Sequence, residues 1–208
     1  MAGDPRAELD AQKKTIHASE QDEAQRAAFV EYLATLQADD LVVIDESGTR
    51  IGMTPLYARA PRGQRAVDRT PRNYGHTYSL IAAMSLQGME ASMVLEGAVD
   101  QTAFLAYLRD FLLPTLRPGQ LIIMDNLSVH KGTSVQLLIE AHGCHILFLP
   151  PYSPDFSPIE QAFAKIKTFL RRHKALSLDT LHDAIAAALE TISVSDALAW
   201  FRHCGFPV

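Results

Sequence analysis

Apolar residues along the chain are grouped in two ways, and this grouping predicts the order of strands and helices. Short runs rich in β-branched residues indicate buried strands. Such runs occur, in order, at 41–47, 77–88, 89–97, 121–126 and 145–149. The second and third runs meet at the Gln87-Gly88 turn, which is typical of a hairpin. Residues 48–72, rich in Gly, Pro and Arg, predict a twisted hairpin after the first strand.

Helical spacing of apolar residues alternates with these runs. Residues 100–113 predict an amphipathic helix that Pro114 helps to end. Further helices are predicted at 7–38 (polar, with a weak stripe of Phe29, Leu33 and Leu36), 132–141 and 158–173, followed by two more, one with Leu181, Ile185, Leu189 and Ile192 on a common face. Three strands in a meander and then alternating helices and strands predict an α/β fold, a mixed five-stranded sheet with helices on both faces.

The 208 residues suffice for one core domain with helical extensions. We expect a helical preface or linker at 1–40, the core domain at 41–175 and a C-terminal helical extension at 176–208. No apolar run approaches the length of a membrane span. Cys144 and Cys204 form no paired framework and no CxxC motif, which favours a reducing compartment, and we expect a cytoplasmic protein.

Charge is distributed unevenly along the chain. The net charge of −5 comes entirely from residues 1–40, whereas basic residues cluster at 50–72 and 165–174. The first cluster holds six arginines and a single acid, Asp68, and the second holds five bases and no acid. Such clusters can bind a polyanion, although charge alone is more often a solvated face.

Two strands end in the same way. Four apolar residues precede aspartate in both 41–45 and 121–125. If these strands are parallel neighbours, Asp45 and Asp125 emerge at one carboxyl edge of the sheet, where ligands gather in open α/β folds. Two adjacent carboxylates repel each other, and a hard divalent cation would relieve that repulsion. The alternative is that each aspartate merely ends its strand in a turn.

Glu160 follows an unusually stiff loop. Four prolines occur within nine positions, at Pro150, Pro151, Pro154 and Pro158, and each restricts the backbone. Ser157-Pro158-Ile159-Glu160 also fits a capping box, in which Glu160 would reach back to the cap amide. A capping box explains the glutamate without chemistry, but it does not explain the three earlier prolines.

A resemblance to a known family follows from these motifs taken together. Asp125-Asn126, His130, thirty-four residues between Asp125 and Glu160, and the loop PPYSPDFSPIE closely resemble the DDE transposases of the mariner-like superfamily, with the bacterial insertion-sequence branch as the nearest match. The match covers about residues 10–175, and it includes Asp45-Glu46 and the segment APRGQR at 60–65. Phe156 and Ser157 stand where the family usually has Leu and Asn.

The resemblance implies an RNase H-like fold and a DDE catalytic domain at 41–175. It implies two-metal phosphoryl transfer on DNA, with Asp45, Asp125 and Glu160 holding two Mg²⁺ or Mn²⁺ ions. Glu46 should point to the opposite face from Asp45, so we do not assign it to the metals. Asn126 and His130 are expected near the site. The basic side chains expected to contact the nucleic-acid backbone are Arg62, Arg65, Lys165, Lys167 and Arg171.

The implied function is cleavage of DNA at the ends of an insertion element and strand transfer to target DNA. Family members usually carry helix-turn-helix domains before the catalytic core, and we expect that the net-acidic segment 1–40 cannot supply them. We therefore expect a separate helix-turn-helix polypeptide or a truncated product, and a homodimer when the protein is assembled on DNA. Two alternatives stay open: a catalytically inactive remnant that regulates as a DNA-binding partner, and a stand-alone RNase H-like nuclease.

Overall fold

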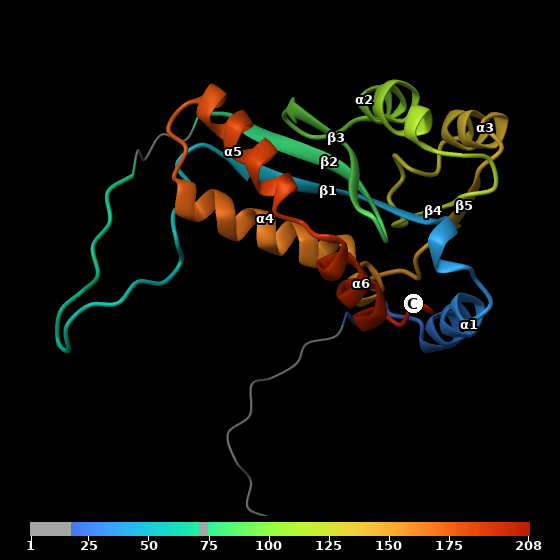
Figure 1. The fold of residues 1–208 in the computed structure, drawn as a ribbon, viewed down its shortest axis with the longest axis horizontal. Coiled ribbons are helices and arrows are strands. Elements are labelled where there is room, and N and C mark those ends of the chain that lie inside the picture. Colours follow the sequence, from blue (N-terminus) through green and yellow to red (C-terminus); the bar gives the residue numbers. More distant parts are fainter. Residues whose placement is uncertain (1–17, 71–74) are drawn as a thin grey trace, which may run out of the picture.

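A computed structural model describes residues 18–70 and 75–208. Its centre is a mixed sheet with the strand order β3-β2-β1-β4-β5 (Figure 1). Strand β1 pairs antiparallel with β2 and parallel with β4, β2 pairs antiparallel with β3, and β4 pairs parallel with β5. The strands are β1 (Leu41–Arg50), β2 (Thr77–Ser85), β3 (Gly88–Glu96), β4 (Leu121–Met124) and β5 (His145–Phe148). The predicted five-stranded mixed sheet is confirmed.

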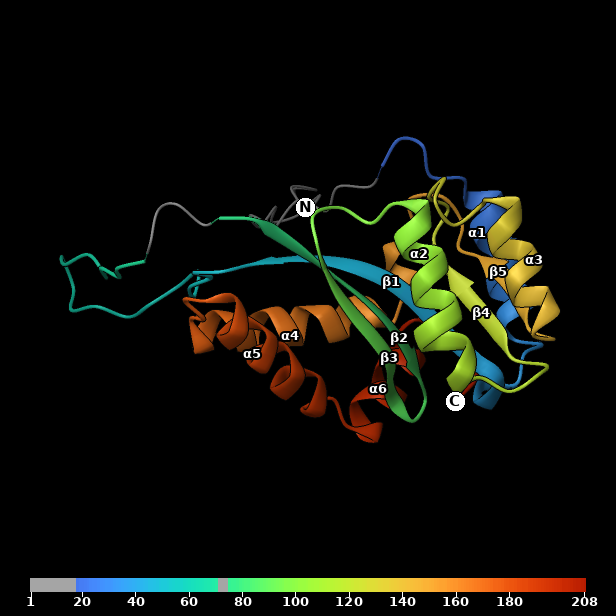
Figure 2. The same ribbon diagram turned by 90° about the horizontal axis from the view of Figure 1, so that it is seen from above.

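Helices cover both faces of this sheet (Figure 2). One face carries α2 (Gln101–Tyr107) and α3 (Thr133–Ala141), and the other carries α4 (Ile159–His173), α5 (Leu178–Glu190) and α6 (Val194–His203). The alternation of side chains along β1 explains the two layers. Val42 and Ile44 pack in the cluster with α2 and α3, whereas Leu41 and Val43 pack in the cluster with α4, α5 and α6.

The N-terminal helix α1 (Glu23–Leu33) packs on the same side as α4 and α6. Asp22 caps it by accepting from the amides of Ala24 and Gln25. Phe29 and Leu33, both predicted to be apolar contacts of this segment, are buried in that core. The part of the predicted 7–38 helix before residue 18 lies outside the described residues. The domain boundaries at residues 40 and 175 stay predictions.

The predicted hairpin at 48–72 is wrong. Strand β1 continues to Arg50, and the described residues 51–70 form no strand but an extended arm that projects from the body (Figure 1). Pro55 and Pro61 lack the amide donors that a ladder needs, and the arginines leave little apolar surface to bury. The base of the arm is fixed where the Gly52 amide donates to the Ala175 carbonyl at 2.8 Å.

The helix predicted at 100–113 is present with an irregular end. Helix α2 continues as a π-helical turn, Leu108–Leu112, and a 3₁₀ turn, Leu113–Thr115. Pro114 has no amide hydrogen to continue α-helical bonding, which fits the change of helix type before it. Within the described part of the chain, no single helix is long and apolar enough to span a membrane; only α5 and α6 taken together, bent by 75°, reach that length and composition.

Candidate active site

The parallel pairing of β1 with β4 brings Asp45 and Asp125 to corresponding positions. Leu41 lies opposite Leu121 and Val43 opposite Ile123. Continuing that register by two residues puts the two aspartates side by side, where β4 has just ended. The predicted parallel neighbours are therefore confirmed.

Glu160 is brought close to these two aspartates by a helix and not by a strand. It lies in the first turn of α4, which follows the proline loop after β5. Asp45, Asp125 and Glu160 all line one cavity of about 470 Å³. The rest of its lining comes from Asn126, Leu127, residues 149–154 and Ser157. The structure thus gathers three carboxylates from three separate elements around a single opening.

The negative charges of the carboxylates in this cavity repel one another. Burial and the negative charges of Glu160 and Asp125 together raise the pKa of Asp45 to about 7, although a hydrogen bond from the Glu46 amide opposes the rise. Burial also acts on Asp125, but hydrogen bonds from His130 and the Leu127 amide outweigh it and hold the pKa of Asp125 below its usual value. The cavity therefore holds at least one carboxylate that is costly to ionise without a cation.

The predicted capping box at Ser157 does not form. The N-cap of α4 is Pro158, which has no side-chain cap bond. The Ser157 hydroxyl is buried and makes no hydrogen bond with any described residue. True capping boxes occur instead at Ser177 and Ser193, which start α5 and α6. Glu160 is exposed in the cavity and does not serve as the cap partner that the sequence motif suggested.

His130 is fully buried between two acids. Its Nδ1 lies 2.7 Å from Asp125 Oδ1, its Nε2 lies 3.0 Å from Glu46 Oε1, and the Phe104 ring packs at 4.4 Å between centroids. Burial alone would lower the pKa of His130, but the hydrogen bonds to Asp125 and Glu46 outweigh it and raise the pKa to about 9. The protonated, cationic form of His130 is therefore favoured, and its Nδ1 fixes the position of the Asp125 carboxylate. Glu46, which sequence reasoning left without a role, completes the arrangement.

Removing this imidazole is expected to destabilise the fold. In His130→Ala, Glu46 is left almost buried without its partner, and we expect a loss of about 3 kcal/mol in the free energy of unfolding, measured in urea. Glu46→Gln in the same background should recover part of the loss, because a neutral amide is cheaper to bury. The exposed His203→Ala, at the end of α6, serves as the control and should change stability by less than about 0.5 kcal/mol. Equal losses in His130→Ala and His203→Ala would contradict this role.

Asn126 connects the site to the proline loop. Its side-chain amide donates to the Leu149 carbonyl, at the residue where β5 gives way to the loop. Asn126 lines the cavity, and His130 contacts Asp125 from a buried position outside the cavity lining.

The predicted basic residues fall in different places. Arg62 and Arg65 are exposed on the arm, and Lys167 and Arg171 are partly exposed on α4. Lys165 is partly exposed as well, but its Nζ already donates to the Thr191 carbonyl at 2.7 Å and to Asp196 at 2.8 Å. The structure therefore does not collect the five into one surface.

The residues fit a divalent metal in kind, because three carboxylates line one cavity. The donors that the three acids bring are oxygens alone, which suit Mg²⁺ or Mn²⁺ better than zinc. In their present positions, no three His, Cys, Asp or Glu side chains of residues 18–70 and 75–208 stand close enough to enclose an ion. Repulsion among the three carboxylates favours this separation, and a bound cation would draw them together.

Comparison with known proteins identifies both a family and a fold. The sequence profile of a family described as DDE superfamily endonuclease matches residues 40–182. Among curated proteins, no sequence matches significantly.

Similar solved structures share the fold of nearly the whole chain. The Mos1 transposase paired-end complex with left transposon end matches with a TM-score of 0.78 at 16% identity, covering 95% of this chain and 64% of that one. The Mos1 mariner paired end complex with Mn matches with a TM-score of 0.74 at 17% identity, covering 95% of this chain and 63% of that one. The catalytic domain of Mos1 mariner transposase matches with a TM-score of 0.65 at 14% identity, covering 88% of this chain and 83% of that one. The predicted RNase H-like fold is confirmed. The chain spans about 64% of the length of the first of these relatives.

Proposed function

The chain belongs to the DDE superfamily endonucleases, and from that premise we propose that it is a transposase catalytic domain that cuts DNA at the ends of an insertion element and joins those ends to target DNA. The observation that carries this proposal is the meeting of Asp45, Asp125 and Glu160 around one cavity. The similar Mos1 structures include complexes with a transposon end and with Mn, which supports DNA and a divalent metal as partners here. The bacterial insertion-sequence branch stays a prediction.

The three acids are proposed to hold two Mg²⁺ or Mn²⁺ ions. When bound, such ions activate a water molecule or a DNA 3′-hydroxyl and stabilise the leaving oxygen of an in-line displacement. Asp45 and Asp125 supply ligands from fixed positions on the sheet, and Glu160 supplies the third from α4. His130 keeps Asp125 oriented through its 2.7 Å contact. The open cavity gives a phosphate backbone access to all three.

DNA is proposed to lie across the cavity and to contact basic residues on the arm and on α4. Arg62 and Arg65 on the arm, and Lys167 and Arg171 on α4, would contact phosphates without reading sequence. We leave Lys165 out of this surface because Thr191 and Asp196 already engage it. Recognition of element ends is assigned to a separate helix-turn-helix polypeptide or domain, with a homodimer forming on DNA. The buried free thiols of Cys144 and Cys204 fit a cytoplasmic setting.

Two assays on the purified chain test the proposal. Supercoiled plasmid should be nicked with Mg²⁺ or Mn²⁺ and left intact with EDTA. A labelled oligonucleotide with a free 3′-hydroxyl should become joined to plasmid under the same conditions. Nicking without joining would favour the stand-alone nuclease. Neither reaction, despite metal binding, would favour the inactive remnant.

A further inference from the structure

An arginine of the N-terminal helix makes polar contacts with the proline loop. Arg26 of α1 forms two bonds with Asp155: its Nη2 lies 2.7 Å from Oδ2 and its Nη1 lies 3.1 Å from Oδ1. The same Nη1 donates to the Ser153 hydroxyl at 2.7 Å. The guanidinium carbon also lies 4.5 Å from the centroid of the Phe156 ring. Charge, geometry and ring contact thus fix one cation against three residues of the loop.

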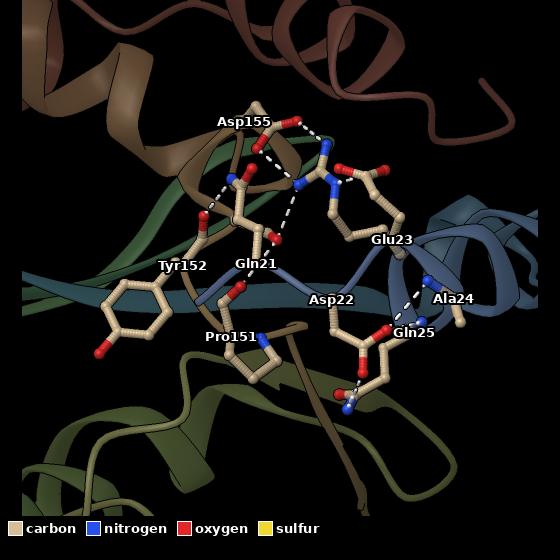
Figure 3. A network of polar contacts seen from close by, with 10 residues as sticks. Gln21, Asp22, Glu23, Ala24, Gln25, Pro151, Tyr152 and Asp155 are labelled. Carbon is tan, nitrogen blue, oxygen red and sulfur yellow. Dashed lines mark hydrogen bonds and ion pairs between the residues drawn. The ribbon is translucent and has the colours of Figure 1, made fainter. Parts of the chain in front are cut away.

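These bonds continue into the loop backbone. Ser153 Oγ donates to the Pro151 carbonyl at 3.1 Å, and Gln21, just before α1, donates to the Tyr152 carbonyl at 2.6 Å (Figure 3). Tyr152 has a φ of 54°, in the left-handed region that side chains disfavour. The segment 21–26 therefore holds the loop at its strained residue and at two residues that follow it.

The loop held in this way leads directly to Glu160. Ser153 and Pro154 line the cavity together with Glu160. Residues 154–156 form a 3₁₀ turn, and α4 begins three residues later, at Ile159. Phe29 of α1 packs on Phe156 with 5.2 Å between ring centroids. Any shift of this turn relative to α1 would therefore move the start of α4 relative to the sheet that carries Asp45 and Asp125.

We propose that Arg26 is a positioning residue for Glu160, acting through Ser153 and Asp155. This inference rests on the proposed function, because positioning matters only if Glu160 must meet the other two acids. Arg26 is well placed for the role, with its side chain 16% exposed against 55% for Asp155. An exposed pair contributes little, but a forked arginine that is mostly buried sets geometry as well as energy. Helix α1 thus supports the active site through the loop without lining its cavity.

The test compares Arg26→Gln, Arg26→Lys, Asp155→Asn and the double variant Arg26→Gln/Asp155→Asn. Arg109→Gln is the matched control, because Arg109 also pairs with an acid, Asp110, but at an exposed position on the opposite helical layer. Hydrogen exchange of the amides of residues 152–160 reports loop position, titration with MnCl₂ alone reports the metal site, and plasmid nicking reports activity.

In Arg26→Gln we expect loop exchange to rise and Mn²⁺ affinity to fall, each by about tenfold, as for the loss of charge-assisted hydrogen bonds. Arg26→Lys should give loop exchange and Mn²⁺ affinity between those of the wild type and of Arg26→Gln, because lysine keeps the charge without the forked geometry. The double variant should be no worse than Arg26→Gln, since the two residues act as one unit. Nicking should need more metal in Arg26→Gln, and high Mn²⁺ should restore it in part. Arg109→Gln should match the wild type throughout.

Unchanged loop exchange and Mn²⁺ affinity in folded Arg26→Gln would overturn the inference. Should that variant fail to fold, the same two measurements on Asp155→Asn decide, because this acid is the more exposed partner. The outcomes stay separate from the proposed function. A wild-type chain that neither binds Mn²⁺ nor nicks DNA refutes the proposed function and with it the positioning role. A wild type that does both, with Arg26→Gln indistinguishable from it, refutes the positioning role alone.

Discussion

Glu160→Gln is expected to fold as the wild type does and to lose Mg²⁺-dependent nicking by about 10³-fold or more. The physical reason is that glutamine keeps the size of the side chain but replaces an anionic ligand with a weakly coordinating amide. Stability should be unaffected, because Glu160 does not close a capping box: Ser157 makes no such bond and Pro158 is the N-cap. Rates of plasmid nicking and urea unfolding curves measure the two effects separately.

The control for this prediction is Glu140→Gln. Glu140 is an exposed glutamate on α3, on the other side of the sheet, so it shares the chemistry of the change but not the cavity. It should nick at the wild-type rate. Retained nicking in Glu160→Gln would remove Glu160 from the metal site. A large loss of stability in that variant would show that its carboxylate has a structural partner.

Asp45→Asn is expected to have opposite effects on stability and on activity. Burial and the charges of Glu160 and Asp125 raise the pKa of Asp45 to about 7, so its ionised form is costly in the metal-free protein. Asparagine removes the charge while its carbonyl oxygen can still accept from the Glu46 amide, as Asp45 does at 2.7 Å. We expect the variant to be about 1–3 kcal/mol more stable in EDTA. Nicking should fall by about 10³-fold or more, since one ligand is lost.

The measurement is a pair of thermal unfolding curves, one in EDTA and one in Mg²⁺. The wild type should gain stability from Mg²⁺, because a ligand that binds only the folded state shifts unfolding upward. Asp45→Asn should unfold at a higher temperature than the wild type in EDTA, and Mg²⁺ should add little to its stability. A variant less stable than the wild type in EDTA would mean that the Asp45 charge is compensated within the protein. An undiminished response to Mg²⁺ would mean that the ion binds elsewhere.

The strands and the three acids could be predicted from sequence because each depends on local patterns. The β-branched runs at 41–47 and 121–126 indicated strands, and the matched aspartates at their ends indicated a shared edge once the strands were parallel. The prolines around 150–158 marked a stiff loop before α4. In each of these cases, the residues that determine the feature lie next to it in the chain.

The supporting contacts could not be predicted in this way. His130 meets Glu46 across 84 positions, and Arg26 meets Asp155 across 129. No periodicity links such pairs, and only the folded chain brings them together. The capping motif at Ser157 failed for a related reason: the local pattern was correct, but the course of the loop left its hydroxyl buried without a hydrogen-bond partner and made Pro158 the N-cap. The arm at 51–70 failed as a hairpin because turn-forming residues do not by themselves supply an apolar face.

The central claim is that Asp45, Asp125 and Glu160 together bind divalent ions at the carboxyl edge of the sheet. Anomalous X-ray diffraction from crystals grown with MnCl₂ tests it most directly. We expect two manganese peaks about 4 Å apart, with carboxylate oxygens of all three acids among their ligands. Manganese density that involves none of these acids, or only one of them, would contradict the account.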